Sequence, residues 1–116
     1  MSDAIFTLCL DGERVQSEDL FHQEIKQQTG IEWYGSNLDA LDEMLASIIP
    51  ETCGPFRVIW ENADLSHQGF GQRYLMVVGM MKEMQQRFPD RFLDFRMTFS
   101  EPYFDEGQDP FLRPNR

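Results

Sequence analysis

The spacing of apolar residues predicts three β-strands. Residues 4–10 form an almost unbroken apolar run, which is typical of a strand covered on both faces in a parallel sheet. Residues 56–60 form a second buried run. Residues 93–99 instead alternate between apolar and polar side chains, so this third strand is expected to have one solvated face and to lie at an edge of the sheet.

Two helices are predicted between the first two strands. Ser17 is a suitable N-cap for the first, and Gly30 suits the left-handed position just beyond its end. The second is expected to begin at Ser36 or Asn37 and to run to about residue 49, because Pro50 disfavours a helical conformation in the residue before it.

A third helix is predicted over residues 72–88, before Pro89. The methionines at positions 76, 80, 81 and 84 are interpreted as adaptable core packing, with a methionine-rich binding surface as the alternative. Residues 62–71 are expected to form a loop or a short helical turn. Five residues recur at helical spacing and predict a buried stripe on this helix: Tyr74, Val77, Met81, Met84 and Phe88.

The order of the predicted elements, β-α-α-β-α-β, indicates an α/β fold. Strands separated by helices pair in parallel through right-handed crossovers. The length of 116 residues suits one domain with a core of its own, which we expect to occupy residues 1–100. Residues 101–116 contain three prolines and few apolar residues, so they are expected to form a C-terminal tail that is partly disordered.

The charge of the chain is strongly negative and unevenly distributed. Twenty acidic residues against ten Lys and Arg give a net charge of −10, and the first 56 residues hold eleven of the acids but only two bases. This balance disfavours nucleic-acid binding and favours a basic protein partner. No apolar run is long enough to span a membrane, and no signal peptide is recognisable at the N-terminus, so we expect a cytoplasmic protein with no membrane association.

Neither the cysteines nor the histidines form a metal or redox motif. Cys9 and Cys53 are too few for a disulfide framework, so both are expected to be reduced, Cys9 buried in the first strand and Cys53 unreactive in a loop. His22 and His67 lack the spacing of zinc ligands. Phosphate-binding and dinucleotide-binding motifs are also missing from the sequence, which therefore predicts no cofactor and no catalytic residue.

The second predicted helix has one acidic face. At about 100° per residue, Asp39, Asp42 and Glu43 share an arc of roughly 100°, and the small Ala46 lies within it. The acids are explained either as a solvated face near the positive end of the helix dipole or, less simply, as a Mg²⁺ or Ca²⁺ site. Neighbouring carboxylates repel one another, and no Lys or Arg occurs between positions 27 and 56, which favours a third explanation: a surface that binds a basic partner.

The stretch WYGSNLDALDEML, residues 33–45, resembles the sequence signature of the barstar family of intracellular ribonuclease inhibitors. The resemblance extends over the order of elements from Ile5 to Phe99. It implies a three-stranded parallel sheet packed against about four helices. It also implies that the second helix, with the loop before it, plugs the active site of a small basic ribonuclease or nuclease toxin.

The acidic face and the resemblance together give the candidate partner-binding residues. Glu43 matches a central Asp of the family, and Asp42 stands where the family has an aromatic residue, which suggests a differently shaped target cleft. The resemblance places Trp33 against the enzyme's catalytic His. The full set is Trp33, Tyr34, Asn37, Leu38, Asp39, Asp42, Glu43 and Ala46.

The sequence thus predicts a ribonuclease inhibitor that is not itself an enzyme and that is most simply a monomer. The same scaffold also suits the immunity partner of a nuclease toxin. Two alternatives stay open at this stage. One is a barstar-like interaction module without ribonuclease inhibition, and the other is a metal-dependent enzyme that uses the acidic helix face.

Overall fold

Three parallel strands form the sheet at the centre of the fold. The computed structural model describes residues 5–100, so the predicted tail, residues 101–116, lies outside the described part of the chain. Strands β1 (Phe6–Asp11), β2 (Phe56–Glu61) and β3 (Phe92–Met97) lie side by side in the order β1-β2-β3. The expected three-stranded parallel sheet is confirmed, with the third strand at an edge.

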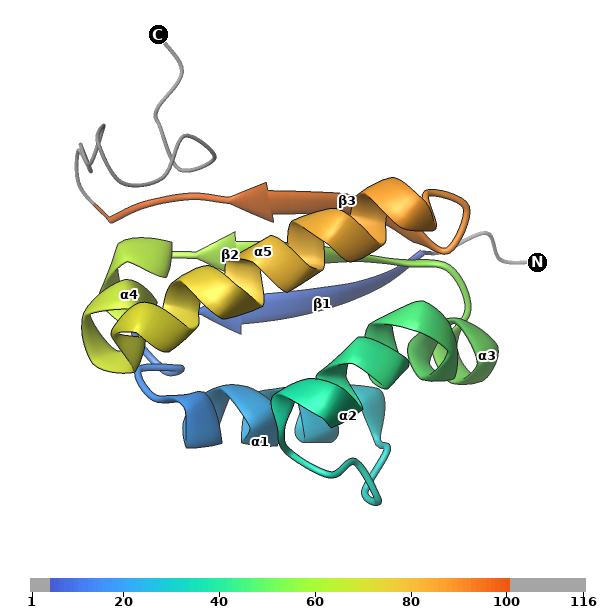
Figure 1. Ribbon diagram of the computed structural model, residues 1–116, viewed down its shortest axis with the longest axis horizontal. Helices are drawn as coiled ribbons and strands as arrows, with labels where there is room; N and C mark the ends of the chain where they lie inside the picture. Colours follow the sequence, from blue (N-terminus) through green and yellow to red (C-terminus); the bar gives the residue numbers. More distant parts are fainter. Residues whose placement is uncertain (1–4, 101–116) are drawn as a thin grey trace, which may run out of the picture.

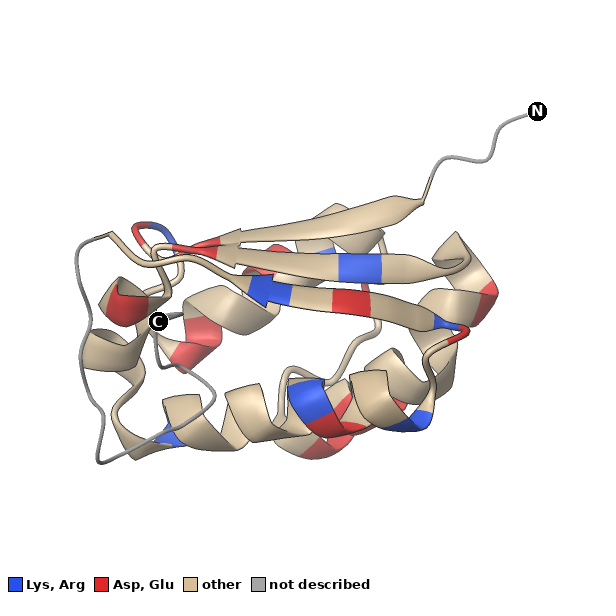
Figure 2. Ribbon diagram, turned by 90° about the horizontal axis from the view of Figure 1, so that it is seen from above, with Lys and Arg blue, Asp and Glu red and all other residues tan. Residues whose placement is uncertain are grey.

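The helices gather on one face of this sheet (Figures 1 and 2). Within residues 5–100, none of them combines the length and the apolar content needed to cross a bilayer. Of the two possibilities predicted for residues 62–71, a loop or a short helical turn, the structure has the helical one, since α4 occupies most of this segment. The helical elements are α1 (Glu18–Thr29), α2 (Leu38–Glu43), a π-helical segment η1 (Met44–Ile48), α3 (Ile49–Cys53), α4 (Ala63–Phe70) and α5 (Gln72–Arg87).

The caps of α1 agree with the sequence prediction. The side chain of Ser17 accepts a hydrogen bond from the backbone N–H of Leu20, and this satisfies one of the free donors of the first turn. Gly30 adopts φ 74° and donates its backbone N–H to the carbonyl of Lys26. This C-cap ends the helix before the chain turns towards Trp33.

Pro50 does not end the second helix, which was predicted to stop there. The helix continues as α3 to Cys53, because the chain first widens into η1, where the Ile49 N–H bonds to the carbonyl of Met44. Pro50 has no N–H for the carbonyl of Ala46, four residues earlier. The guanidinium of Arg91, which donates from Nη1 at 3.0 Å, satisfies that carbonyl instead.

Among residues 5–100, the helices cover one face of the sheet, and Cys9 of the first strand is exposed on the other, so the prediction that both faces of this strand are buried was wrong. Leu8 and Leu10 are buried under the helices, whereas Cys9 between them is exposed on the other face. Cys9 and Cys53 are both free cysteines. Burial raises the pKa of the Cys53 thiol, which favours its unreactive form.

A bulge in β3 explains a core residue that the alternating pattern missed. Phe56 pairs with Phe92, but the next residue, Arg57, pairs with Asp94, so Leu93 is the extra residue. The bulge reverses the phase of the alternation. Phe92 is therefore fully buried, and its ring stacks on Phe56 with centroids 4.7 Å apart.

The core is organised around Trp60 of β2. Its indole stacks on Phe21 of α1 at 5.4 Å and meets Tyr74 of α5 edge-on at 5.6 Å, which joins two helices to the central strand. The indole N–H donates to Ser66 of α4, and the Ser66 hydroxyl donates to the carbonyl of Val15. Every polar atom of this buried group therefore has a partner.

Glutamine side chains from the helices bind the backbone of both outer strands. The amide of Gln28 on α1 accepts from the N–H of Cys9 at 2.9 Å and donates to its carbonyl at 2.6 Å. Gln85 on α5 donates to the carbonyl of Leu93 in β3 at 3.3 Å. Helix side chains thus continue the hydrogen bonding of the sheet beyond its strands.

Two glycines in the helices differ in how close their neighbours lie. A Cβ atom at Gly69 in α4 would lie 1.7 Å from the backbone oxygen of Gln16, so only glycine lets α4 approach the start of α1 this closely. A Cβ atom at Gly79 in α5 would meet nothing within 4 Å. Packing inside the chain therefore requires the first glycine and not the second.

We expect alanine at these two positions to change stability in opposite directions. Gly69→Ala should lower the free energy of unfolding by about 2 kcal/mol or more, because backbone atoms must shift to admit the methyl group. Gly79→Ala should raise it by up to about 1 kcal/mol, because alanine is the better helix former. Urea denaturation of the two variants measures both values, and equal effects would contradict the packing described here.

Candidate partner-binding face

Helix α2 and the start of η1 present one exposed acidic face. Asp39, Asp42 and Glu43 are all exposed, in agreement with the predicted arc. The opposite side of the same segment is fully buried against the core. Packing therefore fixes the orientation of the three carboxylates, and the side chains that hold it are Leu41, Met44, Leu45 and Ile49.

The three carboxylates are not neutralised by the rest of the described chain. Among the ion pairs within residues 5–100, none involves Asp39, Asp42 or Glu43. Two of the basic residues, Arg57 in β2 and Arg96 in β3, lie in the sheet, whose ribbon shows basic positions in blue in Figure 2. Like charges that are held together without ion-pair partners create a local negative field that attracts a cationic surface.

The loop before α2 exposes an aromatic side chain and caps the helix. Trp33 is 70 % exposed, the most exposed of the large apolar residues in the described chain. The side chain of Asn37 accepts from the N–H of Ala40 at 2.8 Å, so this predicted contact residue also begins α2. Ser36 has φ 60°, a left-handed conformation that is uncommon for serine. The loop therefore holds a strained turn directly beside the acidic face.

A small hollow of about 180 Å³ lies where this loop meets the helix. The Trp33 side chain forms one wall and the Glu43 side chain another. An indole beside a carboxylate suits a cationic group, which gains from both the ring face and the negative charge. The remaining lining residues are Tyr34, Gly35, Ala40, Met44 and Ile48.

Tyr34, which was predicted as a contact residue, lies beneath this surface. Its side chain is buried, and its hydroxyl is hydrogen-bonded to Nδ1 of His22 on α1. The other ring nitrogen of His22, Nε2, lies 3.1 Å from a carboxylate oxygen of Glu18. Since a carboxylate only accepts, Nε2 carries the proton and Nδ1 accepts from the tyrosine hydroxyl. Tyr34 thus supports the loop from below.

Arg73 on α5 completes this chain of hydrogen bonds. Its Nε donates to the other carboxylate oxygen of Glu18 at 2.8 Å. The bond from Arg73 holds the pKa of Glu18 below its usual value, while burial lowers the pKa of His22 and raises that of Tyr34. Burial thus favours neutral His22, and the network of hydrogen bonds joins the loop to two helices.

Of the eight residues predicted to contact the partner, five are exposed at this face or its edge. Leu38 and Ala46 are half-buried at the border of the face, while Tyr34 supports it from below. Sequence reasoning missed the supporting residues His22, Glu18 and Arg91. Glu18 and His22 are four residues apart, a spacing that brings side chains into contact on the surface of a helix, so the sequence could have indicated this pair. No local signal connects Arg91 to Ala46, 45 positions earlier.

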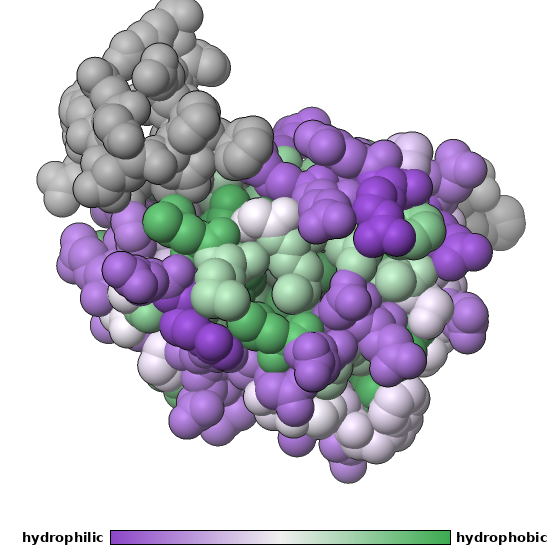
Figure 3. All heavy atoms as spheres, viewed as in Figure 1, coloured by the Kyte–Doolittle hydropathy of each residue, from purple (hydrophilic) through white to green (hydrophobic). Residues whose placement is uncertain are grey.

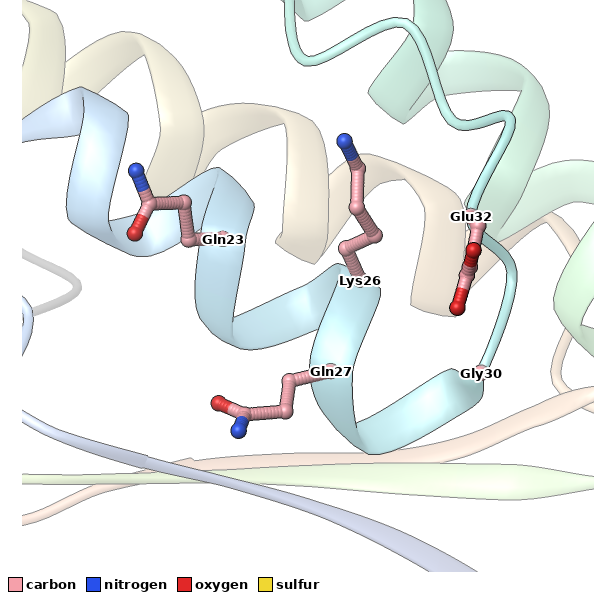
Figure 4. A pocket seen from close by; sticks show the side chains of 5 residues that line it. All are labelled: Gln23, Lys26, Gln27, Gly30 and Glu32. Carbon is pink, nitrogen blue, oxygen red and sulfur yellow. The ribbon is translucent and has the colours of Figure 1, made fainter.

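Other parts of the described surface show less organisation. An open hollow of about 500 Å³ beside α1 is lined by polar side chains that point in different directions and do not converge (Figure 4). Over residues 5–100, no three His, Cys, Asp or Glu side chains form a group that could hold a metal ion. The acidic face is therefore the candidate functional site.

We expect acidification to destabilise the chain through His22. Because burial lowers the pKa of His22, the unfolded chain binds the proton more readily than the folded chain. The stability due to neutral His22 is complete above its ordinary pKa of 6.5 and is lost as the pH falls towards the folded value. One group changes the free energy of unfolding by at most about 1.4 kcal/mol per pH unit.

Urea denaturation between pH 8 and 5 tests this expectation. The His22→Gln variant should show a smaller loss than the wild type over that range. Glu18 does not confuse the comparison, because its lowered pKa matters only below its ordinary value of 4.5. Parallel stability curves for the two proteins would contradict the role assigned to His22.

The comparison with known families agrees with this arrangement. Residues 5–100 match the family described as Barstar (barnase inhibitor). A comparison with curated proteins finds no match. The family match extends from the residue before β1, through the acidic helix, to the end of the described chain. The resemblance found in residues 33–45 is thus part of a similarity over the whole domain, and the chain belongs to the barstar family.

Proposed function

We propose that this chain binds a small basic ribonuclease and covers its active site with the acidic face of α2. The observation that carries the proposal is the set of three exposed carboxylates, Asp39, Asp42 and Glu43, on one rigid helix face with no ion-pair partner in the described chain. A ribonuclease active site holds phosphates with cationic groups. Carboxylates fixed at similar positions offer those groups charge-assisted hydrogen bonds.

The loop supplies the second part of the proposed interface. Trp33 offers an exposed ring beside Glu43, so a cation or an imidazole of the enzyme can stack on the indole while it meets the carboxylate. The network below Tyr34 fixes the loop in advance. Fixing the geometry before binding reduces the ordering cost of association.

The proposal implies a protective role inside the producing cell. The inhibitor acts in the cytoplasm as a monomer and keeps a ribonuclease, or the nuclease domain of a toxin, inactive until export. Inhibition by obstruction requires no catalytic residue and no cofactor on this chain.

Single substitutions on the acidic face should weaken binding without harming the fold. Glu43→Ala should cost about 2–5 kcal/mol of binding free energy, because it leaves a buried cation of the enzyme unpaired, and Asp42→Ala should cost less. The free energy of unfolding should change by no more than about 0.5 kcal/mol, with a small gain because repulsion is relieved. Glu13→Ala serves as the matched control, since it removes one exposed carboxylate in the turn after β1.

The measurement is inhibition of RNA cleavage by barnase and by a panel of other small basic ribonucleases, followed by binding kinetics with the enzyme that is inhibited most strongly. Equal binding by the wild type and the Asp39→Ala/Glu43→Ala double variant would show that the acidic face is not the plug. The chain would then be a barstar-like interaction module.

The association rate should also fall steeply with added salt. The first 56 residues carry eleven acids and two bases, and steering by such a field weakens as the Debye length shrinks from about 10 Å at 0.1 M salt to about 3 Å at 1 M. Stopped-flow association at increasing NaCl concentrations measures this dependence. An association rate that does not change with salt would contradict electrostatic steering.

A further inference from the structure

A groove of about 520 Å³ separates the acidic helix from α5. One wall includes Asp42, and the other belongs to the outward side of α5. The residues of α5 that line it are Leu75, Met76, Gly79, Met80, Glu83, Met84 and Arg87.

Much of the α5 wall is apolar and open to solvent, and Glu83 and Arg87 lie at one end of it. Met76 is 53 % exposed, and Leu75 and Met80 are half-buried, whereas Met81 and Met84 are packed in the core. Figure 3 shows apolar side chains gathered across this face of the molecule. The methionines of α5 therefore divide into two groups. The interpretation as core packing holds for positions 81 and 84 and in part for position 80, whereas Met76 is exposed at the surface.

Gly79 forms an opening between these side chains. It is exposed in the middle of the 16-residue helix α5, where glycine is costly for helix stability. No neighbour explains its presence, because a Cβ atom there would meet nothing within 4 Å. The missing side chain leaves space at the helix backbone that an approaching group from outside can fill.

The groove is continuous with the acidic face. Asp42 belongs to both, and at the far end Glu83 faces Arg87 at 3.6 Å. An interface of ordinary size buries about 800 Å² on each partner, which is more than one short helix face provides. A ribonuclease seated on Asp39 and Glu43 would therefore extend over the groove as well.

We infer that the groove between α2 and α5 receives a bulky apolar or aromatic side chain of the bound ribonuclease, next to a basic residue that pairs with Asp42. This inference rests on the proposed function and explains how the chain would distinguish one basic ribonuclease from another. The flexible thioethers of Met76 and Met80 adapt to the inserted side chain, and Gly79 lets it reach the helix backbone. The groove thus selects among basic ribonucleases, which the acidic face alone attracts without distinction.

The test fills the groove without disturbing the fold. Gly79→Gln adds a side chain where the free protein has space, and Gly79→Ala is the smaller step of the same kind. Met76→Ser removes an exposed apolar wall. Leu20→Ser on α1 is the matched control, since Leu20 is also an exposed apolar residue but does not line the groove. The probe is the ribonuclease that the panel identifies as most strongly inhibited.

We expect Gly79→Gln and Met76→Ser to raise the Kd by about tenfold or more, with Gly79→Ala between these variants and the wild type. Leu20→Ser should bind like the wild type. The urea midpoints of the glycine variants should not fall below that of the wild type, which separates loss of binding from loss of structure. The loss should also differ between ribonucleases of the panel, because the groove distinguishes them.

Three results would overturn the inference. If the groove variants bind normally while Glu43→Ala does not, the groove proposal is wrong and the proposed function stands. If no ribonuclease is inhibited, both fail together. The third result is that sedimentation shows the free chain to be a dimer and that Gly79→Gln makes it dissociate. In that case the groove binds a second copy of this chain, and its assignment to the ribonuclease is wrong.

Discussion

The hydrogen bond between the Tyr34 hydroxyl and the His22 imidazole joins the surface loop to the core. It holds the loop between its exposed ring and the acidic helix, since Trp33 directly precedes Tyr34 and Asn37 caps α2 three positions after it. The bond needs a neutral imidazole whose Nδ1 is free to accept, with the ring proton on Nε2 donated to the carboxylate of Glu18. The buried hydrogen bond between Tyr34 and His22 therefore holds the backbone that carries the exposed ring of Trp33.

Much of the fold was predictable because its determinants are local. The caps Ser17 and Gly30 act within one helical turn, and the acidic arc of α2 follows from helical periodicity alone. The WYGSNLDAL stretch was enough to indicate the family. These features depend on residues that are close together in the sequence, so the sequence pattern contains them.

The remaining features depend on contacts between distant residues, which no local pattern records. The helix passes Pro50 because Arg91, from the other end of the chain, satisfies the carbonyl of Ala46. Phe92 is buried because a bulge reverses the phase of β3. The groove exists because α5 packs beside α2, and the apolar positions of α5 alone could not distinguish its core methionines from Met76. Helical periodicity thus anticipated the exposed acidic face, whereas the groove beside it depends on how two distant helices pack.

The glutamines that bind the outer strands have a consequence for the behaviour of the chain in a crowded cell. In the described part of the chain, β1 and β3 form the two edges of the sheet, and unpaired backbone groups at an edge recruit strands from other molecules. The side-chain amide of Gln28 already bonds to both the N–H and the carbonyl of Cys9. These two groups in the middle of β1 are therefore not available to pair with the backbone of an incoming strand. Side chains of the helices that pack against the sheet thus protect its edge strands from pairing with strands of other molecules.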